Sequence, residues 1–423
     1  MFPKAVALFL TLFLCALAEP LAPLIAAEIP ARQPIQEVRA TGGMVVSDSD
    51  IASRVGRDVL ADGGNAVDAA VATAFALGVV QPESSGIGGG GFVVVYRAGE
   101  SRADVIDARE VAPTKATRDL YVRDGKLVPR ASVDGARAVG VPGEVAGLFL
   151  AHQKFGRLSW RAVVKPAALL ALRGFRVTEY LAGALLRFRE PAFLAKWPAF
   201  RREFFRADGS AYHPGDVMRR PDLARTLEVI ARHGRDGFYR GDVGRAIARA
   251  AGDAAGGILG DADLAAYEPK RRDAITGRYR GLMVYAMPPP SSGGVVLLEA
   301  LALLEAFDLR ALLAKNAFHH LLTQALIFGF ADRANLLGDA DGADVPWRRL
   351  LSRAHAEKLR AAFDPARRTP HPDWPRPAVK TRDDGGTTHL SVMDADGNAV
   401  ALTTTINTTF GSKVVVPGTG ILL

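Results

Sequence analysis

The alternation of polar and apolar residues is most regular near the C-terminus, where it predicts a β-hairpin. Polarity alternates over 388–393 and again over 399–406, and residues 394–398 between them, Asp-Ala-Asp-Gly-Asn, are turn formers. Successive strand side chains point to opposite faces, so even and odd positions form two different faces. The even, apolar face contains Leu390, Val392, Val400, Leu402 and Ile406. The odd, polar face contains Thr387, His389, Ser391, Thr403, Thr405 and Asn407.

The register of this hairpin decides which polar side chains meet. A hairpin centred on Asp396 places Thr387 opposite Thr405, with Cβ atoms about 5 Å apart. A slip by two residues keeps both faces and changes the partner. We therefore expect both Thr405 and Asn407 near Thr387.

Elsewhere the pattern mixes helices with strands. Asn65 can cap a helix that runs to about Val80, and its Ala and Val residues on most faces indicate burial against a sheet. Residues 92–96 and 103–106 read as a hairpin around Gly99, which leaves Arg109 just past a strand end. Further helices are expected near 144–154, 158–173, 220–233, 295–306, 317–337 and 350–363. This mix favours an α+β layered architecture.

Length and composition agree with a single large enzyme domain. The chain has 423 residues, of which 49% are hydrophobic, so it can bury a substantial core. The proline-rich stretch from Thr369 to Pro377 is expected to form an exposed loop.

The N-terminus has the pattern of a secretory signal peptide. Lys4 precedes a nearly all-apolar run over 5–17, and small residues suit cleavage after Ala18 or Ala27, so we assign residues 1–27 to the signal. The run is too short to predict a stable membrane span. The only cysteine, Cys15, lies inside it, which leaves no disulfide after cleavage, and Leu14 is bulkier than a lipid anchor at Cys15 requires. A periplasmic or secreted location is expected.

A basic charge balance raises the question of nucleic-acid binding. The net charge is +8, and residues 200–206, Phe-Arg-Arg-Glu-Phe-Phe-Arg, mix aromatic and basic side chains as single-strand binders do. The other arginines are spread along the chain, and export removes most nucleic-acid partners. We expect no nucleic-acid partner, and a solvated or packed helix at 200–206.

Candidate chemistry is concentrated at Gly385-Gly386-Thr387. Two glycines allow backbone conformations in which the Thr387 hydroxyl can attack its own preceding carbonyl. The cut would free an α-amine, whose pKa of about 8 suits a general base for the adjacent hydroxyl. Thr405 could hold the nucleophile's oxygen, and Asn407 could bind a polar substrate group. The alternative is an ordinary Thr-rich strand, since threonine has high β-propensity.

Two other signals are weaker. Gly86, Gly88 and Gly91 satisfy a dinucleotide-binding spacing, but a strand follows them where that fingerprint needs a helix. The adjacent pair His319-His320 would point about 100 degrees apart on a helix, which makes a poor metal site. No metal site is predicted, and His389 is interpreted as a strand neighbour of Thr387 rather than as its base.

Several motifs together resemble one known family, the gamma-glutamyltransferases, over about residues 41–423. They occur in the family's order, and several long motifs in order are more specific than any single one. The matching segments are Gly63–Ala72, Gly86–Phe92, Asp107–Pro113, Gly140–Gly143, Tyr279–Gly281, Pro288–Gly294, Phe330–Arg333, Leu337–Asp339 and the stretch from Asp383 to Asn407.

The resemblance implies an N-terminal-nucleophile hydrolase with an αββα layered sandwich. It implies one precursor that is cut at Gly386-Thr387 into a large-subunit region, residues 28–386, and the start of a small subunit, residues 387–423. Substrates would be glutathione and related gamma-glutamyl amides, with water, amino acids or peptides as acceptors. The small subunit would be the partner of the large one, and no cofactor would be needed.

The resemblance also implies roles for single residues. Thr387 corresponds to the nucleophile and Thr405 to the second threonine that hydrogen-bonds it. Asn407 corresponds to a residue that holds the glutamyl amino group, and Arg109 to the arginine that binds its α-carboxylate, which a planar guanidinium can do through two hydrogen bonds. The alternative for Arg109 is a salt bridge to the neighbouring Asp107 or Glu110.

The sequence departs from the family pattern at its end. It stops at residues 417–423, whereas the family continues with an acidic run, a serine pair and a glycine pair that complete the amino-group pocket and supply oxyanion donors. Ser291-Ser292 follows three prolines and is interpreted as a structural turn instead. We expect either a fragment of a gamma-glutamyl hydrolase or transpeptidase, or a truncated, catalytically silent homologue that binds glutamyl ligands or a partner.

Overall fold

The structure, a computed structural model, describes residues 37–314, 317–374 and 385–423. The predicted signal peptide, 1–27, lies outside these residues. The chain divides into two units, 1–41 and 42–423. In the first unit, the described residues 37–41 include an ion pair between Arg39 and Glu37. All elements below belong to the second unit.

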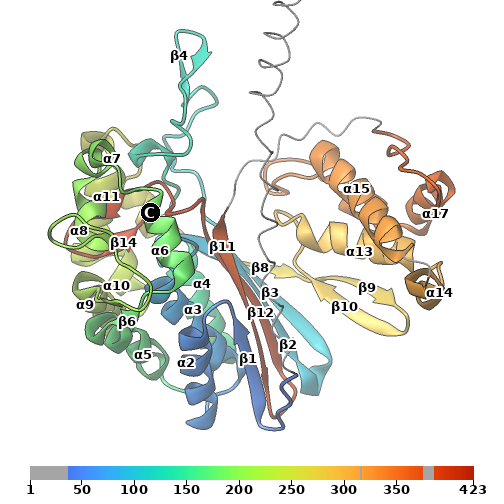
Figure 1. Ribbon diagram of the computed structural model, residues 1–423, viewed down its shortest axis with the longest axis horizontal. Helices are drawn as coiled ribbons and strands as arrows, with labels where there is room; N and C mark the ends of the chain where they lie inside the picture. Colours follow the sequence, from blue (N-terminus) through green and yellow to red (C-terminus); the bar gives the residue numbers. More distant parts are fainter. Residues whose placement is uncertain (1–36, 315–316, 375–384) are drawn as a thin grey trace, which may run out of the picture. The chain divides into compact units, whose positions relative to one another are not determined.

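A six-stranded antiparallel sheet forms the framework of the second unit. Its middle is made by the C-terminal strands β11 and β12, which lie between N-terminal strands, so segments far apart in the sequence are side by side (Figure 1). In sheet order the strands are β1 (Gly43–Ser47), β11 (Gly386–Asp394), β12 (Ala399–Asn407), β2 (Gly90–Arg97), β3 (Arg102–Ala108) and β8 (Lys270–Asp273).

Helices cover one face of this sheet. Helix α3 (Ala66–Val80) contacts both β11 and β12, and all of its residues are buried, as its Ala- and Val-rich faces predict. Asn65 caps it through the backbone N–H groups of Val67 and Asp68, which confirms the expected start. Helix α2 (Asp50–Ala61) packs on α3 and β1, and α4 (Glu144–Phe155) packs on β2 and β3.

Further helices, which follow in the sequence up to residue 266, pack behind this layer. They are α5 (Trp160–Arg173), α6 (Glu179–Leu186), α7 (Pro191–Lys196), α8 (Pro198–Phe204), α9 (Pro221–His233), α10 (Asp236–Tyr239), α11 (Gly241–Ala251) and α12 (Asp261–Ala266). This unit also contains three short two-stranded pairs: β4 (Val122–Arg123) with β5 (Lys126–Leu127), β6 (Phe175–Arg176) with β7 (Val217–Met218), and β13 (Val415–Val416) with β14 (Ile421–Leu422).

Residues 275–362 form a second group of elements with hydrophobic clusters of their own. The group contains the hairpin of β9 (Ile275–Tyr279) and β10 (Leu282–Ala286) and the helices α13 (Gly293–Leu304), α14 (Leu309–Ala314), α15 (Phe318–Leu336), α16 (Trp347–Leu350) and α17 (Arg353–Ala362). The predicted turn at Ser291 is present, because its N–H donates to Pro288 O at 3.1 Å. No helix within the described residues combines the length and apolar character needed to cross a bilayer.

The aromatic side chains of residues 200–206 pack in the interior and do not face solvent. Phe200, Phe204 and Phe205 are buried, and the rings of Phe200 and Phe204 contact Phe410 near the C-terminus. The packed-helix interpretation of this segment is therefore confirmed.

Arg220 links three of these elements from a fully buried position. Its guanidinium donates to Gly78 O and Val79 O at the end of α3, to Gly420 O before β14, and to the carboxylate of Glu203 on α8. Only 2% of Arg220 is exposed. A buried charge is stable when it is paired and its donors are used, and Arg220 meets both conditions.

Arg220→Met should therefore lower the free energy of unfolding by about 3–5 kcal/mol, since it leaves Glu203 buried without its counter-ion. Urea unfolding followed by circular dichroism measures the loss. Arg219→Met is the matched control, because Arg219 is exposed and its one hydrogen bond goes to Arg173 O, so a change of about 0.5 kcal/mol or less is expected. Equal losses in both variants would contradict the role assigned to Arg220.

Candidate active site

The hairpin of β11 and β12 has the register that the sequence predicts. Thr387 pairs with Thr405, and Met393 pairs with Ala399, so the hairpin is centred on Asp396. Leu390 and Val392 are buried under the helices, while Thr387, His389 and Ser391 are exposed on the opposite face. The prediction of Thr387 opposite Thr405 is therefore confirmed.

Buried polar contacts reinforce this register. The Thr388 hydroxyl, on the buried face, donates to Asp48 Oδ2 at 2.6 Å. At the turn, Asp394 Oδ1 accepts the N–H of Asn398, and its Oδ2 accepts the N–H of Ala66 at the start of α3. A slip of one residue would break both contacts and turn the apolar side chains to solvent.

The Thr405 hydroxyl contacts both the predicted nucleophile and the predicted scissile carbonyl. Its Oγ1 lies 2.8 Å from Thr387 Oγ1 and 2.7 Å from Gly386 O, and it accepts the N–H of Asn407 at 2.9 Å. A hydroxyl has one proton and two lone pairs. A carbonyl oxygen only accepts, so Thr405 must donate to Gly386 O and accept from the Thr387 hydroxyl. All three of its hydrogen-bonding positions are then used.

A β-bulge shapes the backbone at this point. Gly386 pairs with Asn407 and Thr387 with Thr405, so Ile406 is an extra residue on β12. Asn407 has φ 73°, a left-handed conformation that is uncommon for a residue with a side chain. A Cβ atom on Gly386 would lie 2.2 Å from Thr408 O, so the close approach of the two strands requires glycine there.

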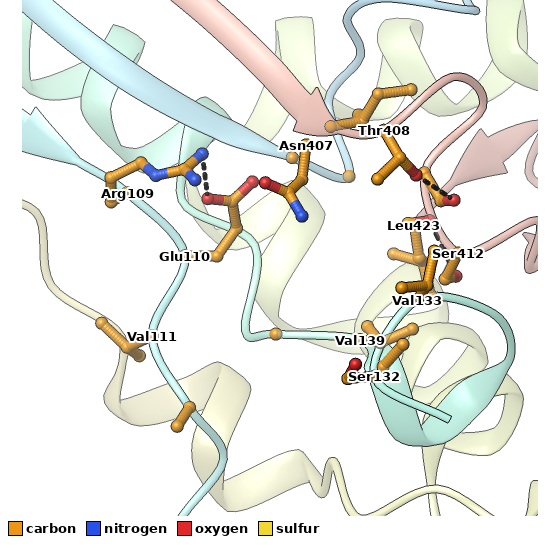
Figure 2. Close-up of a pocket in the computed structure, with 17 residues that line it drawn as sticks. Arg109, Glu110, Val111, Ser132, Val133, Val139, Asn407, Thr408, Ser412 and Leu423 are labelled. Carbon is orange, nitrogen blue, oxygen red and sulfur yellow. Dashed lines mark hydrogen bonds and ion pairs between the residues drawn. The ribbon is translucent and has the colours of Figure 1, made fainter. Parts of the chain in front are cut away.

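A cavity of about 250 Å³ adjoins this pair of strands and contains both predicted substrate-binding residues. Figure 2 shows the side chains of Arg109, Glu110 and Asn407 gathered along it. Among the described residues, Thr387 and Thr405 do not line the cavity. Asn407 connects the cavity with the threonine pair. Its side chain lines the cavity, and its backbone N–H donates a hydrogen bond to the Thr405 hydroxyl.

The glycine-rich loop before β2 lies between the cavity and β12. Gly88 and Gly89 line the cavity, and a Cβ atom on Gly89 would lie 2.0 Å from Thr405 O. A strand follows this loop, as predicted, so it lacks the helix that a dinucleotide site needs.

Contacts on both sides hold the backbone of Arg109 just past the end of β3. Its N–H donates to Asp107 Oδ1 at 3.0 Å, and its carbonyl accepts the Tyr267 hydroxyl at 2.9 Å. Its guanidinium Nη1 lies 2.9 Å from Glu110 Oε2, while the Asp107 carboxylate pairs with Arg272. Of the two salt bridges considered from the sequence, the one to Glu110 is present.

Two carboxyl groups in this region, those of Glu110 and Glu144, have raised pKa values. Burial raises the pKa of Glu110 above its ordinary value, against the opposing effect of Arg109. Burial also raises the pKa of Glu144, in the first turn of α4, to about 8. The raised pKa favours the neutral form of Glu144 at pH 7, so Glu144 adds no second negative charge beside Glu110, the carboxyl group that pairs with Arg109. Glu144 was not among the residues predicted from the sequence, although a glutamate at the start of a largely apolar helix was a possible signal.

His389 has contacts that agree with its interpretation as a strand neighbour. Its Nδ1 lies 2.8 Å from Thr403 Oγ1 and its Nε2 lies 3.4 Å from Ser391 Oγ, both on the exposed face. Burial lowers its pKa, which favours a neutral ring.

Solved structures share this architecture. The gamma-glutamyltranspeptidase of Helicobacter pylori is 38% identical, with a TM-score of 0.75 over 80% of this chain and 95% of that chain. The cephalosporin acylase of Bacillus halodurans is 30% identical, with a TM-score of 0.77 over 93% of this chain and 72% of that chain. These neighbours have the N-terminal-nucleophile hydrolase fold, so the predicted fold class is confirmed.

Sequence comparison agrees with this fold. The glutathione hydrolase proenzyme of Escherichia coli K12 is 40% identical over 388 residues, which are 91% of this chain and 66% of that protein. The chain thus spans just under two thirds of that relative's length. The gamma-glutamyltranspeptidase family model matches residues 52–423. The match covers most of the sequence, including the hairpin and the cavity, and the chain belongs to the gamma-glutamyltranspeptidase family.

Proposed function

We propose that this chain is a gamma-glutamyl hydrolase or transpeptidase that cleaves itself at Gly386-Thr387 and then uses Thr387 as its nucleophile. The observation that carries the proposal is the position of the Thr405 hydroxyl, within hydrogen-bonding distance of both Thr387 Oγ1 and Gly386 O. The similar proteins named glutathione hydrolase proenzyme support it.

Self-cleavage would begin with attack of Thr387 Oγ1 on the carbonyl carbon of Gly386. As the C–N bond breaks, the hydroxyl proton is transferred to the Thr387 nitrogen, so an ester joins Gly386 to the Thr387 oxygen and the Thr387 amine becomes free. Water then hydrolyses the ester. Thr405 would stabilise the negative charge that develops on Gly386 O, because its proton already points there.

Turnover would reuse the same oxygen. The freed α-amine accepts the proton of the Thr387 hydroxyl, whose oxygen attacks the γ-carbonyl of a glutamyl amide such as glutathione. The leaving amine takes that proton, and a Thr387 acyl-enzyme remains. Water or an amino acid then releases the glutamyl group. This sequence needs no cofactor.

Substrate orientation would come from the cavity. Arg109 would bind the α-carboxylate of the glutamyl group, exchanging its contact with Glu110 for two charge-assisted hydrogen bonds. Asn407 would bind the α-amino group, since its amide oxygen can accept. The neutral state of Glu144 supports anion binding here, because it adds no negative charge near Arg109.

The same proposal covers processing and location. Residues 1–27 would direct export to the periplasm or the medium, residues 28–386 would form the large subunit, and the segment from 387 onward would begin the small subunit.

Thr387→Ala should abolish both cleavage and turnover, because it removes the attacking oxygen. Intact mass measurement with N-terminal sequencing, on protein expressed from its complete reading frame, detects a new terminus at Thr387. Thr387→Ser is the matched control and should still be cut, since it keeps the hydroxyl. An uncut wild type that hydrolyses gamma-glutamyl anilides would rule out this mechanism. An uncut and inactive wild type would favour the silent homologue.

Thr405→Val should slow self-cleavage by about a hundredfold or more, because the scissile carbonyl loses its hydrogen-bond donor. The rate is followed by the appearance of the two fragments on a denaturing gel. Thr403→Val is the control, since Thr403 lies on the same strand face and bonds His389 instead. Equal slowing in both variants would indicate a general effect on the strand.

Arg109→Lys should raise KM for a gamma-glutamyl anilide about tenfold or more while self-cleavage continues at the wild-type rate. Lysine keeps the charge but cannot form the paired hydrogen bonds to a carboxylate. Steady-state kinetics on the cleaved variant measures the change. Loss of cleavage in this variant would show that Arg109 supports the fold instead.

A further inference from the structure

Four side chains that can bind a metal meet within the second group of elements. They are Glu299 on α13, Asp332 on α15, His355 on α17 and His371 in the segment after α17. One potential ligand atom from each lies within 4.8 Å of all the others. Helix α13 packs against both α15 and α17 (Figure 1).

The segment that carries His371 is held along one face of α15. Contacts come from side chains spaced four residues apart on that helix. His320 Nε2 lies 3.0 Å from Asp364 O, Gln324 exchanges two hydrogen bonds with the backbone of Thr369, and the Phe328 ring contacts the His371 ring edge to face. Asp332, the next residue in this spacing, lies 3.0 Å from His371 Nε2.

Asp332 is a well-oriented carboxylate at the centre of the cluster. Its Oδ2 lies 2.8 Å from His355 Nε2 as well as 3.0 Å from His371 Nε2, and its Oδ1 accepts the indole N–H of Trp374 at 2.9 Å. An additional donor of this kind fixes the direction of a carboxylate, as it commonly does for metal ligands.

Glu299 is the unsatisfied member of the cluster. Only 2% of it is exposed, and within the described residues neither carboxylate oxygen has a hydrogen-bond partner. One of these oxygens lies 3.4 Å from His355 Nε2 and faces the same space as Asp332. A buried carboxylate without donors is costly, and either a proton or a further positive group at this position would remove that cost.

We propose that Glu299, Asp332, His355 and His371 bind a structural zinc ion. Zinc bonds of about 2.0–2.1 Å at tetrahedral angles separate neighbouring ligand atoms by about 3.3 Å. The closest separations here are 2.8, 3.0 and 3.4 Å, so small movements bring these atoms to that spacing. The ion would cancel the two carboxylate charges and supply the partner that Glu299 lacks.

The donor set favours zinc over harder cations. Two imidazole nitrogens and two carboxylate oxygens suit zinc, whereas calcium and magnesium prefer six or more oxygen ligands. The four ligands come from four segments and fill a tetrahedral shell, which is typical of a structural site. The ion would cross-link three helices and the segment that carries His371, outside the residues proposed for catalysis.

Binding would require a proton to leave Nε2 of both histidines, because each Nε2 now donates to Asp332 Oδ2. The change at His371 also affects a neighbouring backbone group. His371 Nδ1 accepts the N–H of Asp373 at 3.0 Å, which places the ring proton on Nε2. A zinc bond at Nε2 moves that proton to Nδ1, so the Asp373 N–H must give up this acceptor. The amide of Asp373 should therefore respond to the metal.

The test uses the full chain, stripped with a chelator and then titrated with zinc chloride. We expect one zinc per chain by elemental analysis, a rise in Tm of several degrees, and altered hydrogen exchange in a peptide that contains Asp373. Glu299→Gln keeps the shape but removes the charge, and it should weaken zinc affinity about tenfold or more. His355→Ala should remove the zinc-dependent rise in Tm.

His319→Ala is the matched control, because His319 is an exposed histidine on α15 outside the cluster. It should keep the full response to zinc. Circular dichroism checks that each variant is folded before titration. The proposal is overturned if zinc leaves Tm unchanged, or if Glu299→Gln and His355→Ala respond to zinc as the wild type does. If zinc leaves the Tm of the wild type unchanged, the Tm of Glu299→Gln is compared with that of the wild type. An equal or higher Tm for the variant would show that a proton occupies the place assigned to the ion.

Discussion

The antiparallel pairing of β11 with β12 places Thr387 opposite Thr405, and the contacts of these two threonines depend on this register. The apolar side chains of both strands pack under α3, so a slip by one residue would expose them and bury the threonines. Contacts at both ends reinforce the pairing, through Thr388 and Asp48 near the start of β11 and through Asp394 at the turn. The burial of one face thus fixes the position of reactive groups on the other.

Complete hydrogen bonding gives the Thr405 hydroxyl a defined direction. Its two lone pairs are used by Asn407 N–H and the Thr387 hydroxyl, so its proton is directed at Gly386 O. Arg220 shows the same principle in the core, where buried acceptors satisfy its guanidinium. Glu299 is the contrasting case, a buried carboxylate without a donor in the described residues, and this contrast led to the proposed zinc site.

The cavity contains the positively charged side chain that the proposed gamma-glutamyl substrate would need. Arg109 is held by backbone contacts to Asp107 and Tyr267, so its position does not depend on its salt bridge with Glu110. A substrate carboxylate could replace Glu110 without moving the backbone. Asn407 belongs to both the cavity and the threonine pair, which couples substrate orientation to the reacting oxygen in the proposed mechanism.

The sequence by itself determined the local features of this protein. Period-two alternation was enough to predict the two faces of the hairpin, but it left the register open to a slip of two residues, and the structure selects Thr387 opposite Thr405. A capping residue followed by an apolar run was enough to predict α3. Between residues 179 and 266, α6, α7, α10 and α12 were missed, because elements of four to eight residues give a weak periodic signal. The 11-residue helix α11 was also missed, although it is amphipathic. The motifs also led to the fold class and the family, whereas the catalytic roles and the export signal remain predictions.

Tertiary structure alone decided which distant groups meet. The loop at Thr369–Pro377 was predicted to be exposed, and residues 370, 372 and 373 are, while residues 375–377 lie outside the described part of the chain. His371 is only 2% exposed, because its segment packs on α15. The cluster of Glu299, Asp332, His355 and His371 had no spacing signal, since its members come from four segments. Glu144 likewise acquires its raised pKa from long-range burial. Periodicity and spacing report neighbours along the chain, whereas burial and charge pairing depend on contacts between residues far apart in sequence.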